Sequence, residues 1–148
     1  MESMATQISD FHKTLWSEEL PVVQFRVARP TDKLKEIKKF YCDGLGLKII
    51  SSFEGHSGYS GIMLGLPGRE YHLEFTEHKN GSPCPAPTKD NLLVFYIPEK
   101  KSFDKLIKRL KDVKYNPVKP ENPYWEKNGK TFEDPDGWRV VIMNTAGI

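Results

Sequence analysis

The sequence predicts an α+β protein built from two copies of one strand–helix–strands unit. A β-type run over residues 23–30 ends at Pro30, and a second over residues 92–98 ends at Pro98. Each run leads into a segment whose apolar residues recur every three or four positions, as on one buried face of a helix. These residues are Leu34, Ile37, Phe40 and Tyr41 in the first copy, and Phe103, Leu106, Ile107 and Leu110 in the second. Two such units, each with a curved mixed sheet, are expected to enclose a cavity that holds a small molecule.

We expect one structural domain with four parts. An N-terminal arm covers residues 1–20, and its apolar residues have rough helical spacing. The first module covers residues 21–78 and the second covers residues 90–148. The connector between them, residues 79–89, is rich in proline and glycine, which exclude regular structure. The apolar residues of the arm are Ile8, Phe11, Leu15 and Trp16.

In the first module, Val23, Phe25 and Val27 alternate along the first strand and are expected to form its apolar face, toward the helix. Thr31 or Asp32 is expected to cap the helix, and Gly44 to end it in a left-handed conformation. In the second module, the turn from Asp134 to Gly137 has proline second and glycine fourth, which suits a type I bend between the strands of a hairpin. The further strands are expected over residues 47–53, 59–66, 71–76, 116–119, 130–133 and 138–144.

The composition argues against a nucleic-acid-binding, a membrane-spanning and a disulfide-rich protein. The 148 residues carry a formal net charge of +2 and no basic stripe, so a nucleic-acid partner is not expected. No segment has the roughly 20 consecutive apolar residues that cross a bilayer. Cys42 and Cys84 are too few for a disulfide framework or a thiolate metal site. We therefore expect a cytoplasmic protein.

Three local motifs resemble one known superfamily. Residues 40–47 (FYCDGLGL) resemble its helix end, residues 71–75 (YHLEF) its fourth strand, and residues 132–137 (FEDPDG) its final hairpin. With the duplicated strand–helix–three-strand order, the chain is similar over residues 21–145 to the vicinal oxygen chelate superfamily of glyoxalases, bleomycin- and fosfomycin-resistance proteins and extradiol dioxygenases. The resemblance implies two βαβββ modules, but members perform different chemistry on this scaffold.

Members with chemistry hold a metal through one residue from the first and last strand of each module. The resemblance places these positions at Arg26 (or Gln24, if the helix entry has an insertion), Glu74, Leu92 and Val141. Arginine stays protonated and cannot ligate a cation, and Leu92 and Val141 have no donor atoms. The resemblance therefore implies a protein without the superfamily's metal, in which Arg26 takes the place of the cation and pairs with Glu74.

The expected pocket has polar groups at its floor and aromatic groups at its walls, and it binds a small polar or anionic molecule. Glu74 and His72, on one face of one strand, are the candidate acid–base pair. Both assignments have a purely structural alternative. Arg26 and Glu74 can form an ion pair that only stabilises the sheet, and His72 can be a strand histidine that only makes hydrogen bonds. The candidate ligand-binding residues are Gln24, Arg26, Tyr96, Trp125, Arg139 and His56.

Two other functions remain open. One is a metal-dependent lyase or dioxygenase that holds a divalent ion near Glu74 with the irregular ligand set Gln24, His72 and Glu74. The other is a non-catalytic module that binds a partner protein through its surface. The length of the connector is compatible with a closed monomer and with a homodimer that exchanges modules.

Overall fold

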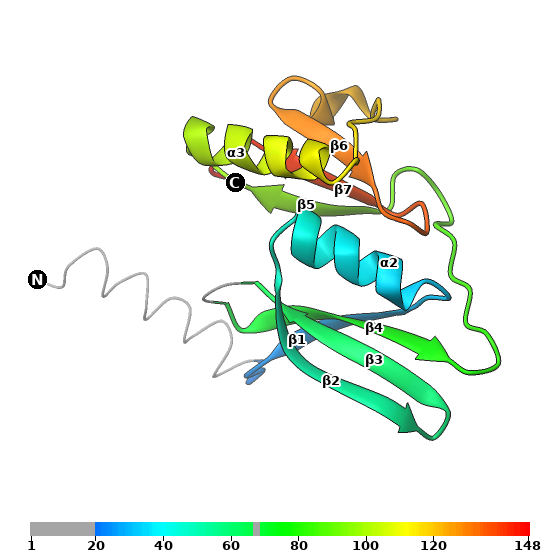
Figure 1. Cartoon of the computed structure of the whole chain (residues 1–148). Helices are drawn as coiled ribbons and strands as arrows, with labels where there is room; N and C mark the ends of the chain where they lie inside the picture. Colours follow the sequence, from blue (N-terminus) through cyan, green and yellow to red (C-terminus); the bar gives the residue numbers. More distant parts are fainter. Residues whose placement is uncertain (1–19, 67–68) are drawn as a thin grey trace, which may run out of the picture.

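The computed structural model describes residues 20–66 and 69–148, so the expected N-terminal arm lies outside the described residues except for Leu20. These residues form two mixed sheets and two main helices, and helix α2 lies between the sheets (Figure 1). Within the described residues, no helix combines the length and apolar character that crossing a bilayer requires.

The first module forms a four-stranded sheet, here called sheet A, in the order β1-β4-β3-β2. Strand β1 runs parallel to β4, and the other neighbours are antiparallel. The expected strands are all present, with β2 and β4 extending further than expected. The elements are β1 (Phe25–Pro30), α2 (Leu34–Lys38), its wider π-helical continuation η2 (Lys39–Gly44), β2 (Lys48–His56), β3 (Tyr59–Gly65) and β4 (Tyr71–His78).

The second module forms the three-stranded sheet B, in the order β5-β7-β6. The strand expected over residues 116–119 is reduced to a single bridge between Val118 and Thr131, so this module is βαββ where βαβββ was expected. The elements are β5 (Leu92–Tyr96), α3 (Lys100–Asp112), the short helix η3 (Pro123–Trp125), β6 (Gly129–Glu133) and β7 (Arg139–Met143).

One apolar core joins both modules. It contains the predicted inner faces of both helices, and the sheets contribute Leu64 and Phe75 from one side and Phe132 and Val140 from the other. The wider turn of η2 places the neighbouring residues Phe40 and Tyr41 in the core together, both fully buried. Helix α2 and this core lie between the two sheets (Figure 1).

Both ends of α2 differ from expectation. The N-cap residue is Lys33, which makes no side-chain cap, and not Thr31 or Asp32. Thr31 instead shapes the turn before the helix, because its Oγ1 accepts a hydrogen bond from the backbone N–H of Lys33. The left-handed residue after the helix is Gly46, with φ +89°, and not Gly44. Gly44 is instead needed for close packing, since a Cβ there would lie 2.9 Å from a methyl group of Leu110 on α3.

Strand β1 keeps the expected alternation but not the expected burial. Val27 pairs with Leu73 of β4, so it lies on the side of sheet A that carries α2, as predicted. However, Val23, Phe25 and Val27 remain 89 %, 55 % and 44 % exposed, because α2 does not reach over this edge strand. The residue of β1 that is buried on this side is charged: the side chain of Arg29 is only 11 % exposed.

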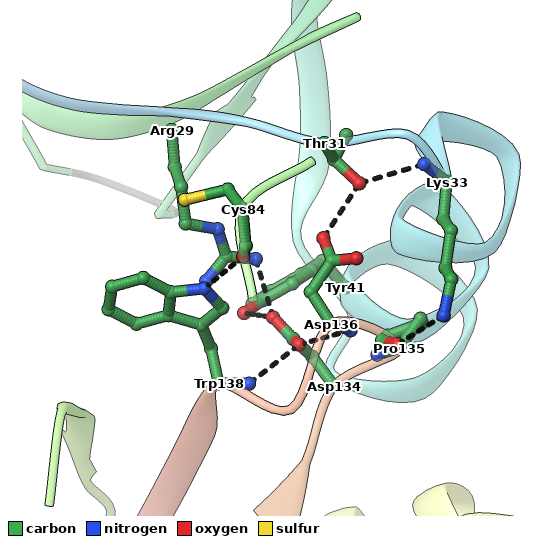
Figure 2. Close-up of polar contacts among 9 residues, drawn as sticks. All are labelled: Arg29, Thr31, Lys33, Tyr41, Cys84, Asp134, Pro135, Asp136 and Trp138. Carbon is green, nitrogen blue, oxygen red and sulfur yellow. Dashed lines mark hydrogen bonds and ion pairs between the residues drawn. The ribbon is translucent and has the colours of Figure 1, made fainter. Parts of the chain in front are cut away.

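A buried carboxylate holds the two modules together (Figure 2). Asp134 Oδ2 accepts from Arg29 Nη2 at 2.6 Å and from the Tyr41 hydroxyl at 2.8 Å. Its Oδ1 accepts from the backbone N–H of residues 136 and 138 within its own turn. The Arg29 guanidinium lies 4.7 Å from the Trp138 ring, in cation–π contact. We call Arg29, Tyr41, Asp134 and Trp138 the inter-module clamp.

Removing the charge of Asp134 is expected to destabilise the whole chain. In Asp134→Asn, the Arg29 guanidinium stays buried without its counter-charge, which costs about 3–5 kcal/mol in comparable sites. The matched control is Asp136→Asn in the same turn, where a carboxylate accepts from the Thr31 hydroxyl and the expected loss is about 1 kcal/mol. Urea unfolding monitored by tryptophan fluorescence measures both. Equal losses for the two variants would contradict the role of the clamp.

The clamp also predicts a loss of stability in alkali. Burial, and then the nearby Asp134 carboxylate, raise the pKa of Tyr41 well above its usual value. Above about pH 10 the unfolded chain releases this proton while the folded chain retains it, so stability falls as the pH rises. Tyr41→Phe removes the proton from both states. We expect a shallower decline of the free energy of unfolding between about pH 10 and 12 in this variant, measured by urea titrations, and an unchanged slope would argue against the raised pKa.

Candidate functional site

Three of the predicted site residues meet on the outward face of sheet A, which is the face opposite α2. Arg26 of β1 pairs in register with His72 of β4, and Glu74 follows two residues later on the same face. Arg26 Nε donates a hydrogen bond to His72 Nε2 at 2.8 Å. Arg26 Nη1 lies 3.6 Å from Glu74 Oε1. The alternation of the two strands thus produces the predicted Arg26–Glu74 pair, and it adds His72 to the pair.

The hydrogen bonds of this trio fix what each group can still do. Arginine only donates, so His72 Nε2 must be an acceptor here and the imidazole proton resides on Nδ1. His72 is 5 % exposed, and the side chains of Arg26 and Glu74 are 40 % and 14 % exposed. The guanidinium therefore keeps unused N–H donors that are open to the outside, while the histidine beneath it is held in one tautomer.

An apolar bed lies beside the trio. Met63 of β3 pairs with Glu74, so its side chain is on the outward face. The glycines on either side of it in the alternation are covered from β2: a Cβ on Gly61 or Gly65 would lie 2.6 Å from side-chain atoms of Phe53 or Ile50, respectively. Phe53, Ile50 and Met63 thus form an apolar surface next to a charged group, which is typical of small-molecule sites.

The sequence interpretation missed this bed. The available signal was the pair of glycines at positions 61 and 65 of a strand whose intervening residues Ile62 and Leu64 are buried in the core. Glycines on the opposite face leave room for neighbouring side chains to lie across the sheet, and this placement marks a close approach. Phe53 and Ile50 occupy that room.

The other predicted residues lie elsewhere. Gln24 precedes β1 and is exposed, and His56 is exposed at the end of β2. Trp125 is half-buried in η3, and Tyr96 is 42 % exposed at the end of β5. Within residues 20–66 and 69–148, none of them, nor Arg139, forms a hydrogen bond or ion pair with the trio.

Arg139 differs from Arg26 in how much of its guanidinium is left to bind a ligand. Its Nε and Nη2 donate to Glu133 Oε1, and its Nη1 donates to the backbone oxygen of Lys119. Arg139 is 4 % exposed and contributes to a hollow of about 520 Å³, which is also lined by Lys89, Lys119, Pro120 and Glu121. With all three of its nitrogens occupied, Arg139 holds β6, β7 and the preceding loop together, and it offers little to a ligand.

The residues present do not fit a divalent metal at the position that the resemblance implies. The side chains with donor atoms at that position are His72 and Glu74, and His72 Nε2 already accepts from Arg26. Among the described residues there is no group of three or more His, Cys, Asp or Glu side chains that could hold an ion. A metal site of this kind needs about three protein ligands, and here a guanidinium lies where a third ligand would be.

Known proteins match both modules. Residues 25–76 match the model of the YycE-like N-terminal domain, and residues 90–144 match that of the YycE-like C-terminal domain. The uncharacterized protein YycE of Bacillus subtilis (strain 168) is 52 % identical over 125 residues, which cover 84 % of this chain and 90 % of that protein.

Solved structures agree with this match. A crystal structure of a YycE protein of unknown function from Bacillus subtilis superposes with a TM-score of 0.81 at 52 % identity, covering 85 % of this chain and 92 % of that one. Two distant structures share the fold. Leishmania major glyoxalase I has a TM-score of 0.64 at 16 % identity (82 % and 86 % covered), and TnmS3, an antibiotic binding protein from Streptomyces sp. CB03234, has 0.59 at 19 % (81 % and 93 % covered).

The superfamily resemblance drawn from the three motifs is thereby confirmed and narrowed. Sharing half of its aligned residues with a protein that it covers almost completely, and matching the models of both halves, this chain belongs to the YycE-like family of the glyoxalase, bleomycin-resistance and fosfomycin-resistance superfamily.

Proposed function

We propose that this chain binds a small anionic or strongly polar molecule on the outward face of sheet A, and that it does so without a metal. The observation that carries the proposal is the Arg26 side chain, which is part-exposed and anchored through Nε to His72. Anchoring one nitrogen fixes the direction of the guanidinium while its outer N–H groups remain free. A planar donor fork of this kind suits carboxylate, phosphate or phosphonate groups.

The positive charge of Arg26 supplies what metal-holding members of the superfamily take from an ion. Glu74 partly balances this charge, but its separation of 3.6 Å from Nη1 is longer than a bidentate pair requires. An incoming anion can therefore compete for the same guanidinium. Arg139 is the less suitable of the two predicted cations, because Glu133 and Lys119 already occupy its nitrogens.

The apolar bed favours a ligand that has a carbon skeleton beside its charged group. Phe53, Ile50 and Met63 border the trio, so a molecule seated on Arg26 would cover apolar surface as well. Burying that surface contributes about 25 cal/mol per Å². The preferred ligand is therefore an organic anion and not a bare inorganic ion.

Glu74 and His72 are the groups that the proposal assigns to any proton transfer at this site. Both lie on β4, two residues apart and on the same face, within reach of a molecule held by Arg26. Binding without turnover is the simpler function. TnmS3, which shares the fold, is named as an antibiotic binding protein, and its example supports sequestration as the function of this chain.

Removing the guanidinium is expected to abolish selectivity for anions. Arg26→Met keeps an unbranched apolar stem and removes the guanidinium with its charge, which should weaken binding of carboxylates and phosphonates about 10–100-fold, the range for a charge-assisted hydrogen bond. Arg69→Met, which removes another exposed arginine, is the matched control and should bind like the parent. Isothermal titration against a panel that includes fosfomycin, acetate and benzoate measures both. Equal affinities in the two variants would rule out Arg26 as the binding cation.

Metal analysis separates the proposal from the metal-enzyme alternative. That alternative uses Gln24, His72 and Glu74, and it requires the Arg26–His72 hydrogen bond to break. We expect protein purified without chelators to contain no stoichiometric divalent ion by mass spectrometry, and added Zn²⁺, Mn²⁺ or Ni²⁺ to leave its melting temperature unchanged, because only a ligand of the native state stabilises it. One bound ion per chain, lost in Glu74→Gln, would establish the alternative instead.

A further inference from the structure

Sheet A has an apolar strip that nothing in the described residues covers. Phe25 and Val27 lie on the side of β1 that carries α2, Phe25 pairs with Tyr71 of β4, and Val23 lies two residues before the strand. Val23, Phe25 and Tyr71 are 89 %, 55 % and 44 % exposed, and Leu20, where the described chain begins, is 56 % exposed. We call Val23, Phe25, Val27 and Tyr71 the β1 strip. It follows the edge strand of sheet A, and contiguous exposed apolar surface of this kind usually marks an interaction site.

We propose that residues 1–19 of the same chain dock on the β1 strip as an amphipathic helix. Their apolar residues Ile8, Phe11, Leu15 and Trp16 follow the steps of three, four and one that place them on one helical face. A helix over 19 residues would be about 28 Å long, and the six residues of β1 extend about 20 Å, so the segment is long enough to cover the strip.

Connectivity favours this occupant over a second copy of the chain. The segment joins the described chain at Leu20, only three residues before Val23, so its effective concentration at the strip is on the order of millimolar. A second copy of the chain, at its concentration in solution, would have to compete with this effective concentration. The helix needs only a tight turn near Pro21 to reverse onto the strip.

The distribution of charge also favours residues 1–19 as the segment that covers the β1 strip. Residues 1–19 contain four acidic residues and one lysine, a formal charge of −3; because the whole chain is +2, residues 20–148 carry +5. An acidic helix is therefore attracted to the rest of its own chain. Two copies of a chain that each carry a net positive body would repel one another at the same surface.

The test is hydrogen–deuterium exchange on the full chain. Residues 8–16 should exchange at least about tenfold more slowly than the same segment as a free peptide, because docking protects helical amides. Val27→Asp places a charge in the strip and should return these residues to the free rate. Ile49→Asp is the matched control: Ile49 is a β-branched residue of equal exposure, 45 % against 44 %, on β2 at the opposite edge of sheet A. It should leave the protection intact.

Leu15→Asp tests the same contact from the other side, and it keeps the experiment decisive if Val27→Asp fails to fold. This variant should also lose protection over residues 8–16 while the amides of β3 and β7 stay as slow as in the parent. Free exchange of residues 8–16 in the parent overturns the proposal. So does equal protection in Val27→Asp and Ile49→Asp. A parent that sediments as a dimer, dissociates in Val27→Asp and exchanges freely over residues 8–16 would assign the strip to a second copy.

Discussion

The carboxylate of Asp134 is the group on which the arrangement of the two modules depends. It is fully buried, and it accepts four hydrogen bonds: one from Arg29 on β1, one from Tyr41 at the end of the first helix, and two from its own turn. A buried charge is tolerated only when its partners are all present. Strand β1, the first helix and the β6–β7 hairpin can therefore take only one position relative to each other, and the shared core forms around that position.

This constraint also positions the candidate site. Arg29 and Arg26 are three residues apart on β1, and the alternation of the strand sends their side chains to opposite faces. The inward arginine is neutralised by Asp134 and stacked on Trp138, so it anchors the strand. The outward arginine donates through Nε to His72 and forms a longer ion pair with Glu74, so its remaining N–H groups can meet a ligand. The two arginines have different roles because one strand places them in a dry and a wet environment.

Periodicity in the sequence was sufficient for the helices, for most strands and for placing His72 and Glu74 on one face of one strand, because these depend on which face a residue takes. The pairing of Arg26 with Glu74 was predicted from the superfamily resemblance, which supplies the order of the strands. Periodicity was insufficient to predict which apolar residues are covered by other elements. Phe25 and Val27 lie on the predicted face, yet α2 has only five residues and leaves this edge open. A charged residue in the same apolar alternation, Arg29, was a sign of a buried partner that was not used. Gly46, and not Gly44, takes the left-handed conformation, and both glycines lie against α3: a Cβ would come within 2.9 Å of Leu110 at Gly44 and of Arg109 at Gly46. These neighbours are distant in sequence, so the local pattern does not reveal them. The expected strand over residues 116–119 shrank to a single bridge because pairing depends on a partner that local pattern does not reveal.

The distance along the chain between Arg29 and Asp134 has a consequence for synthesis. The two residues are 105 positions apart, and the acidic one lies in the β6–β7 hairpin of the second module. While the protein is being made, the first module emerges from the ribosome with a guanidinium that has no counter-charge, and it can reach its final packing only after the last hairpin has followed. Folding should therefore be completed only once the β6–β7 hairpin has emerged and not module by module, and a nascent chain stalled before residue 134 would be a substrate for chaperones and proteases.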